Sequence, residues 1–323
     1  MRGGTQQWAT GTRRHWRRGF LAGLVSAGLL AVGLCCTAAG ASNVSGKAAF
    51  SHGPEWQGMR TVTYCTDGGV PLAMSLFAPS ASPRPVPVVV EIHGGGWQKG
   101  SRLLSLASST TAADLVAAGI MVASVDYRLA PRDPWPDQII DVECAVRFLR
   151  AHAADLGIEP DRIAALGTSA GGQLASLLGM AAVAHEWDQG PYLDQSSRVD
   201  VVVDQFGPVD LTATDWPHDT AVMIRRVFGA YPTPANPVLK AASPVTYAAA
   251  ADAPFLIVQG TDDQVVPLSQ SEELASRLRA AGVPVQLVLV ARGRHGLVTP
   301  GESPSPAAIS TLITAYLSRA LRH

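Results

Sequence analysis

The chain has 323 residues, of which 47% are hydrophobic and 16% charged. A chain with this many hydrophobic residues can bury a large core, so the composition excludes a disordered or low-complexity protein. The formal charge of −1 is unevenly distributed, since the first 41 residues hold five arginines and no acidic residue. Beyond them, 20 basic side chains face 26 acidic ones, a formal charge of −6. We therefore expect no nucleic-acid partner.

Residues 1–41 have the pattern of a secretory signal peptide. Arginines precede an uncharged apolar run over residues 20–34, which ends in small residues. We expect cleavage after Ala41, with Ala39 as the second choice. The pair Arg17-Arg18 before Phe20-Leu21 also resembles a twin-arginine export signal. The sequence therefore predicts a secreted protein.

Two other interpretations of this leader remain open. One is a retained membrane anchor, which the apolar run disfavours because it is about 15 residues long and a span needs about 20. The other is a lipoprotein modified at Cys35 or Cys36, which the bulky preceding residue disfavours. We expect no stable membrane insertion after cleavage.

The remaining cysteines, Cys65 and Cys144, would lie in a compartment where disulfides are permitted. Cys65 falls on an early predicted strand and Cys144 inside a predicted helix. No sequence argument brings them together, so we expect two separate thiols.

Short β-rich runs alternate with helical runs from residue 60 onward. This alternation is typical of an α/β fold in which helices cover both faces of a mostly parallel sheet. Runs of consecutive valines indicate strands buried on both faces. The eight predicted strands are Thr61–Cys65, Leu72–Phe77, Val86–Ile92, Ile120–Val125, Ile163–Leu166, Val199–Phe206, Phe255–Gln259 and Val285–Val290.

Five segments have apolar residues at a spacing of 3.6 and are predicted helices. Residues 207–253 differ, with several prolines and one short helical stretch near Ala221–Phe228. An excursion of this length inside a compact domain usually covers a site, so we expect a small lid inserted in a domain over residues 42–323, with surface decoration as the alternative. The predicted helices are Leu106–Ala118, Pro136–His152, Ala170–Ala184, Ser269–Ala281 and Pro306–Leu321.

A strand-to-helix turn carries the candidate nucleophile. Gly167-Thr168-Ser169-Ala170-Gly171-Gly172 follows a predicted strand and opens a predicted helix. A nucleophile elbow needs small residues two positions before and after its serine, because its turn is strained. Gly-x-Ser-x-Gly alone is weak, arising roughly 0.1 times by chance in a chain of this length. The prediction that Ser169 is the nucleophile therefore depends on the position of this motif between a predicted strand and a predicted helix.

A serine hydroxyl needs a base to take its proton and a carboxylate to orient that base. The strand Phe255–Gln259 is followed by Asp262 and Asp263, and the strand Val285–Val290 is followed by His295. Active sites of open α/β sheets form at these carboxyl ends of strands. The chain order of serine, aspartate and histidine is that of α/β hydrolases, not of chymotrypsin or subtilisin.

A glycine run after the strand Val86–Ile92 has a separate role. His93-Gly94-Gly95-Gly96-Trp97 offers backbone that a substrate can approach closely. Tetrahedral intermediates of acyl transfer need backbone N–H donors for their oxyanion. We expect an oxyanion loop here, with a plain flexible loop as the alternative.

Five segments in this order resemble the hormone-sensitive-lipase-like esterases and related secreted carboxylesterases of the α/β-hydrolase fold. Feruloyl and acetyl-xylan esterases resemble the same outline. The match covers about residues 60–320. The segments are His93–Trp97, Asp126–Pro131, Gly167–Gly172, Gly260–Pro267 and Gly293–Gly296.

The resemblance implies a role for each matched residue. The spacing Gly-x-x-Asp-x-x-Val-Pro places the orienting acid at Asp263, with Asp262 as the rival. Asp126, Tyr127 and Arg128 are expected to be scaffold. Ser169 would be the nucleophile, His295 the base, and the backbone N–H groups of Gly95, Gly96 and Ala170 the oxyanion hole.

Two departures from the family pattern affect the substrate. Thr168 stands where an acidic residue commonly precedes the serine, and residues 42–60 are too short for a large helical cap. A thin lid implies an open cleft, so we count large or polymer-attached esters among the candidate substrates.

The expected activity is that of a serine carboxylic-ester hydrolase acting on short-chain or carbohydrate-linked esters. We expect no metal and no organic cofactor, since His185-Glu186 lacks the second histidine of His-Glu-x-x-His. One alternative is a serine peptidase of the prolyl-oligopeptidase type, which needs a docking domain not recognised in these residues. The other is a non-catalytic binding protein of the same fold, which commonly lacks a triad member.

Overall fold

The computed structural model describes residues 59–322, apart from residues 68, 81, 104–109 and 181–186. The predicted leader, its cleavage sites and the alternatives of an anchor or a lipid attachment lie outside the described residues. Among the described residues, no helix has both the length and the apolar character that crossing a bilayer requires.

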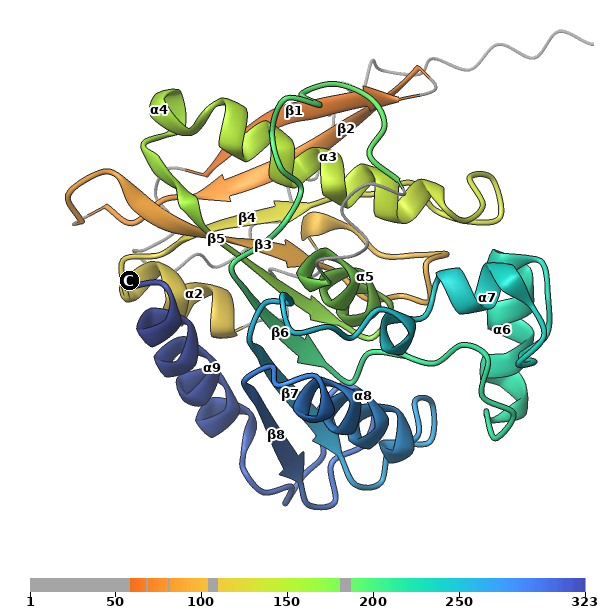
Figure 1. The fold of residues 1–323 in the computed structure, drawn as a ribbon. Coiled ribbons are helices and arrows are strands. Elements are labelled where there is room, and N and C mark those ends of the chain that lie inside the picture. Colours follow the sequence, from red (N-terminus) through yellow and green to blue (C-terminus); the bar gives the residue numbers. More distant parts are fainter. Residues whose placement is uncertain (1–58, 68, 81, 104–109, 181–186, 323) are drawn as a thin grey trace, which may run out of the picture. The chain divides into compact units, whose positions relative to one another are not determined.

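Eight strands form one sheet in the order β1-β2-β4-β3-β5-β6-β7-β8 (Figure 1). β1 and β2 pair antiparallel, β2 pairs antiparallel with β4, and the other neighbours are parallel. The prediction of a mostly parallel sheet of about eight strands is confirmed. The strands are β1 Arg60–Asp67, β2 Val70–Phe77, β3 Val86–Ile92, β4 Met121–Val125, β5 Ile158–Thr168, β6 Val201–Gln205, β7 Phe255–Gly260 and β8 Val285–Val290.

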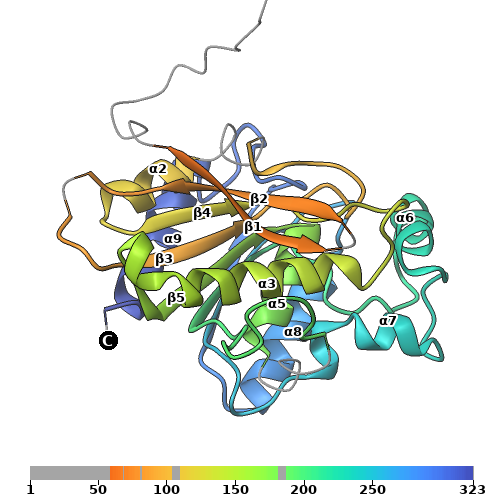
Figure 2. The ribbon, with the colours of Figure 1, turned by 90° about the horizontal axis from the view of Figure 1, so that it is seen from above.

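Helices cover both faces of this sheet, with α2 and α9 on one face and α3, α5 and α8 on the other (Figures 1 and 2). All five predicted helices occur, with residues 106–109 of the first lying outside the described residues. α4, α7 and a short 3-10 helix were not predicted. The helices are α2 Thr110–Ala117, α3 Asp137–Ala151, α4 Ala153–Leu156, α5 Ala170–Gly179, α6 His218–Phe228, α7 Pro237–Ala241, α8 Leu268–Ala280, α9 Pro306–Ala320 and the 3-10 helix Pro244–Thr246.

The core consists of two layers, one on each face of the sheet, and β7 shows why. Phe255 and Ile257 point into the layer under α3, α5 and α8, whereas Leu256 and Val258 point into the layer under α2 and α9. Side chains alternate along a strand, so a strand covered on both faces must be apolar at every position. This requirement explains the uninterrupted apolar runs in the sequence.

Several predicted boundaries differ from the structure by one or two residues, and the start of β5 and the end of α5 differ by five. β5 begins at Ile158, earlier than predicted, because the charged residues and the proline at 159–162 obscure a strand that already pairs with β3 at this end. α5 ends at Gly179, where Met180 adopts an extended conformation. The predicted continuation of this helix to Ala184 falls largely outside the described residues.

Residues 207–253 hold α6, α7 and the 3-10 helix and contain no strand (Figure 1). The predicted helical stretch is α6, which begins at His218 and ends before Gly229, a glycine in the left-handed conformation. Because apolar residues of α6 join the main core, this segment packs onto the domain.

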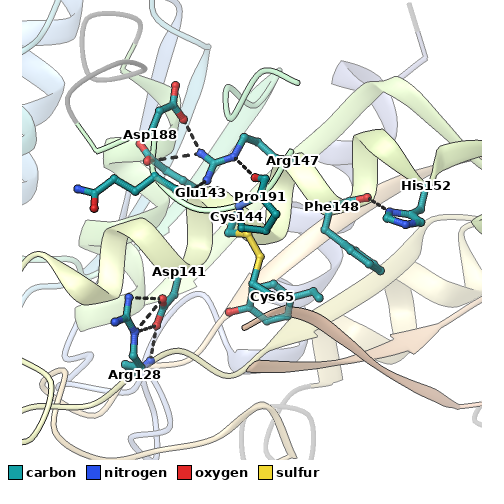
Figure 3. Close-up of a disulfide and its surroundings, with 12 residues drawn as sticks. Cys65, Arg128, Asp141, Glu143, Cys144, Arg147, Phe148, His152, Asp188 and Pro191 are labelled. Carbon is teal, nitrogen blue, oxygen red and sulfur yellow. Dashed lines mark hydrogen bonds and ion pairs between the residues drawn. A yellow bond between two sulfur atoms is a disulfide. The ribbon is translucent and has the colours of Figure 1, made fainter. Parts of the chain in front are cut away.

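Cys65 of β1 and Cys144 of α3 form a disulfide, so the expectation of two separate thiols is wrong (Figure 3). Their Cα atoms lie 6.5 Å apart, and both side chains are buried. The bond joins positions separated by 79 residues, because α3 packs against β1. Neither strand nor helix periodicity reports that packing, so the sequence alone could not predict the pair.

Candidate active site

Ser169 occupies the turn between β5 and α5, with backbone angles of φ 53° and ψ −120°. A positive φ is costly for a residue with a side chain and persists only where its surroundings enforce it. The Ser169 N–H donates to the carbonyl of Gln205 on β6 at 2.9 Å, and its own carbonyl accepts from Gln173 of α5 at 3.2 Å. These bonds fix the turn and expose the serine at the carboxyl edge of the sheet.

The two glycines that flank this serine have no room for a side chain. A Cβ atom on Gly167 would lie 2.0 Å from the carbonyl oxygen of Gly171. A Cβ atom on Gly171 would lie 2.1 Å from the carbonyl oxygen of Ile92 on β3. The Gly-x-Ser-x-Gly pattern is therefore a steric requirement of this strand-helix turn, as the sequence predicts.

The structure brings together the three side chains that the sequence singles out. His295, in the loop after β8, has its Nε2 atom 2.9 Å from Ser169 Oγ. Its Nδ1 atom lies 2.8 Å from Asp263 Oδ2, in the loop after β7. These residues come together because β5, β7 and β8 run parallel and end at the same edge of the sheet.

Asp263 has the contacts of a group that holds the histidine in place. Burial by itself raises the pKa of Asp263, but the hydrogen bond and charge of His295, together with two backbone N–H groups, lower it below its ordinary value. Those N–H groups belong to Val265 and Val266 and donate to Oδ1 at 2.8 and 3.0 Å. The rival Asp262 is exposed, and its carboxylate accepts from Thr261. The geometry thus favours Asp263 over Asp262.

The glycine run after β3 lies directly against the elbow. A Cβ atom on Gly94 would be 2.9 Å from the carbonyl oxygen of Thr168 and 3.3 Å from the Cβ of Ser169. Gly95 and Gly96 both have positive φ, at 119° and 60°. Ala170 is the first residue of α5, where a backbone N–H has no acceptor within the helix. All three expected oxyanion donors therefore belong to backbone segments beside Ser169.

A cavity of about 670 Å³ opens over these groups. Ser169, His295, Gly95 and Gly96 line it, so the reactive hydroxyl and the candidate donors face one space. Apolar side chains line it as well. These are Leu166, Phe206, Met223, Val265, Leu297, Val298 and Ile309.

Among the lining residues that the sequence analysis did not assign to the site, three contact the triad histidine or the glycine loop. Phe206, which follows β6, places its ring edge-on to His295 at 4.9 Å between centroids. Met223 of α6 lies against the glycine loop, since a Cβ atom on Gly96 would be 2.0 Å from its Sδ atom. Lys99 lines the cavity from the turn in which its N–H donates to Gly95. The sequence around these three residues does not mark them as part of a site, because only tertiary packing brings them close to the serine.

The model of the BD-FAE family matches residues 74–278, which is more than half of the chain. Esterase LipC of Mycobacterium tuberculosis is 31% identical over 204 residues, which are 61% of this chain and 49% of that protein. The chain spans about half the length of the curated relatives it matches.

Solved structures share the whole fold. A truncated form of a carbohydrate esterase from gut microbiota superposes with a TM-score of 0.73 and 27% identity, covering 83% of this chain and 98% of that one. The propionate-bound esterase Est2 of the Planctomycetes species Thermogutta terrifontis superposes with a TM-score of 0.68 and 25% identity, covering 82% and 96%. With its eight-stranded sheet and the match of the family model, the chain belongs to the BD-FAE family and has the α/β-hydrolase fold of these esterases.

Proposed function

We propose that this protein is a serine carboxylic-ester hydrolase that works through an acyl-enzyme. The observation that carries the proposal is the continuous contact from Asp263 through His295 to Ser169, at 2.8 and 2.9 Å, beside the glycine loop. The similarity to LipC, Est2 and the gut carbohydrate esterase supports the same class of reaction.

In the acylation step, His295 acts as the general base. Its Nδ1–H donates to the Asp263 carboxylate, which leaves Nε2 to accept the proton of the Ser169 hydroxyl. The serine oxygen bonds to the ester carbonyl carbon, and the carbonyl oxygen becomes an oxyanion. The backbone N–H groups of Gly95, Gly96 and Ala170 stabilise that charge, each such donor contributing about 2.7 to 4 kcal/mol in a comparable hole.

The intermediate then collapses with cleavage of the bond to the alcohol. His295 returns its proton to the departing alkoxide oxygen, which leaves as the alcohol, and the acyl group stays on Ser169. Water enters, His295 takes one of its protons, and the hydroxide oxygen bonds to the acyl carbon. Collapse of this second intermediate releases the carboxylic acid and returns the proton to the serine oxygen.

For substrates, we propose short-chain or carbohydrate-linked esters, free or attached to a polymer. The apolar lining of the cavity suits a short acyl chain, and Est2 binds propionate in its structure. The gut relative is described as a carbohydrate esterase. A panel of acetyl, butyryl, octanoyl and feruloyl esters measures this preference, and an optimum at octanoyl would contradict it.

The serine mechanism is tested with a fluorophosphonate probe and a p-nitrophenyl short-chain ester. We expect the probe to label the protein at Ser169 and Ser169→Ala to abolish both labelling and hydrolysis while the protein stays folded. An unlabelled wild type would favour a non-catalytic binding protein, and cleavage of peptides without esters would favour a peptidase. Near wild-type turnover by Ser169→Ala would end the proposal.

We also propose that residues 1–41 direct export of the protein and are then cleaved off. The arginine-rich leader with its small-residue end supports export. The disulfide between Cys65 and Cys144 also supports it, because such bonds persist mainly in oxidising compartments. N-terminal sequencing of the protein recovered from culture medium is expected to begin at Ser42. Recovery of the intact leader in the cytoplasm would contradict this proposal.

A further inference from the structure

We propose that a cationic groove beside the catalytic cavity binds a carboxylate on the substrate, so that the enzyme prefers esters that carry a negative charge on the acyl or the alcohol portion. This inference rests on the proposed esterase function and extends it to the class of substrate. The reasons are the position of the groove, its charge and the finding that its two cations form no ion pair with any residue that the structure describes.

The groove continues directly from the catalytic cavity. It has a volume of about 530 Å³ and lies between α6 and the loops that follow β3 and β7. Gly95, Lys99, Met223 and Val265 line both spaces. An ester bound at Ser169 can therefore extend past Met223 into the groove without leaving the protein surface.

Its lining is rich in cationic side chains. Lys99 and Arg226 are exposed cations, His218 is an exposed imidazole, and Asp219 is the one carboxylate of the lining among the residues that the structure describes. Since 26 acidic side chains face 20 basic ones beyond residue 41, this local excess of positive charge opposes the charge of the whole domain.

The contacts of Lys99 and Arg226 differ from those of the neighbouring Arg225. Within the described part of the chain, no ion pair or side-chain hydrogen bond involves Lys99 or Arg226. The adjacent Arg225 differs, because its guanidinium lies 4.9 Å from the ring centroid of Tyr231. Lys99 and Arg226 are therefore available to a ligand, whereas Arg225 already packs on an aromatic side chain of the protein.

A carboxylate is the chemical group that such a pair of side chains recognises. A guanidinium offers two parallel N–H donors to the two oxygens, and an ammonium adds a point charge. Monoesters of dicarboxylic acids carry this group on the acyl side, and esters of hydroxy acids or acidic sugars carry it on the alcohol side. Both sources have the same chemistry, and the substrates below distinguish them.

The test compares kcat/KM for substrates matched in shape but not in charge. On the acyl side, p-nitrophenyl hemisuccinate is compared with p-nitrophenyl butyrate, and on the alcohol side p-acetoxybenzoate is compared with p-acetoxybenzamide. We expect the anionic member of at least one pair to be favoured in the wild type. The preference should shrink as salt is added, since screening weakens exposed charge pairs.

The variants assign the preference to the groove. Lys99→Met and Arg226→Gln should each lower the anionic-to-neutral ratio of kcat/KM by about two- to fivefold, the range of an exposed charge pair. Arg225→Gln is the matched control, because Arg225 is also an exposed cation of α6 but does not line the groove. This variant should leave the anionic-to-neutral ratio unchanged. Lys99→Glu should reverse the preference.

The outcomes separate this inference from the proposed function. A wild type that hydrolyses neither member of any pair would argue against the esterase itself. A wild type that hydrolyses the neutral esters, shows no preference for the anionic ones in either pair and keeps its ratio in the Lys99 and Arg226 variants would overturn the anionic groove alone. An equal fall in the Arg225→Gln control would overturn it too.

Discussion

The hydroxyl of Tyr127 donates a hydrogen bond of 2.9 Å to the carbonyl oxygen of His93, and the two rings stack with centroids 4.2 Å apart. Both residues are buried. His93 directly precedes the three glycines of the candidate oxyanion loop, so the bond holds the backbone at the point where that loop begins. Tyr127 is thus a positioning residue for the loop, whereas the sequence analysis assigned it to the scaffold in general.

Tyr127 is in turn held from both sides. Tyr64 of β1 donates to the carbonyl of Asp126 at 2.6 Å. Arg128 forms a buried ion pair of 2.7 Å with Asp141 of α3 (Figure 3). The disulfide lies beside these two contacts. Cys65 directly follows Tyr64 on β1, and Cys144 is three positions after Asp141 on α3. Two elements that carry the supports of Tyr127 are therefore covalently linked.

Removal of the Tyr127 hydroxyl tests its positioning role. In Tyr127→Phe the ring remains, but the His93 carbonyl loses a buried partner, which costs about 1–3 kcal/mol. Because the loop should stabilise the transition state more than the bound substrate, we expect kcat to fall about tenfold with little change in KM.

Steady-state kinetics and the affinity for a trifluoromethyl ketone inhibitor measure this effect. The inhibitor should weaken by the same factor as kcat/KM, since its bound oxyanion uses the same donors. Tyr316→Phe on α9, a half-buried tyrosine of the other face, is the control and should behave as wild type. A lower melting temperature with unchanged kcat would assign Tyr127 a purely structural role.

Loss of the disulfide should destabilise the protein. We expect Cys65→Ser/Cys144→Ser to lower the free energy of unfolding by about 2–4 kcal/mol, because the unfolded chain regains conformations that a long closed loop excludes. Urea denaturation measures the change. Dithiothreitol should shift the wild type to the midpoint of the double variant and leave the double variant where it is. An identical midpoint for oxidised wild type and variant would contradict the prediction.

The two neighbouring aspartates should differ sharply. Asp263→Asn removes the carboxylate that accepts from His295 Nδ1 and favours the wrong tautomer, which in the analogous serine protease triad lowers kcat on the order of 10⁴-fold. Asp262→Asn changes an exposed carboxylate without a contact to His295 among the described residues, so we expect kcat within about twofold of wild type. Equal losses in both variants would overturn the assignment of the acid.

The carboxyl group of Glu143 should make stability fall as pH rises. Burial raises the pKa of Glu143 to about 8, with the charge of Asp188 adding to the shift and that of Arg147 opposing it (Figure 3). Between its ordinary pKa near 4.5 and about 8, the folded protein therefore holds a proton that the unfolded chain has released.

Glu143→Gln should remove this contribution. A single extra proton in the folded state corresponds to a slope of about −1.4 kcal/mol per pH unit at most, and the variant should lose that part of the wild-type slope between pH 5 and pH 8. Urea denaturation at several pH values measures it. Glu273→Gln, on the exposed face of α8, is the control and should keep the wild-type slope. Parallel pH profiles for wild type and Glu143→Gln would contradict the prediction.

Local sequence was sufficient for all eight strands, for the longer helices and for the choice of candidate site residues. Strands buried on both faces must be apolar throughout, so the sequence predicts β3, β6 and β7. The steric limits at Gly167 and Gly171 require the elbow pattern around Ser169. Because parallel strands end at one edge of the sheet, the sequence also indicated which loops would meet.

Only the tertiary structure decided which distant side chains touch. The Cys65–Cys144 bond, the contact of Tyr127 with His93 and the place of Met223 over the glycine loop all join segments whose packing leaves no periodic trace in the chain. The motif spacing already favoured Asp263 over Asp262, and the structure adds the physical reason, because the Asp263 carboxylate contacts His295. Periodicity reports which face of an element is buried, but the partner on that face is set by how whole elements pack.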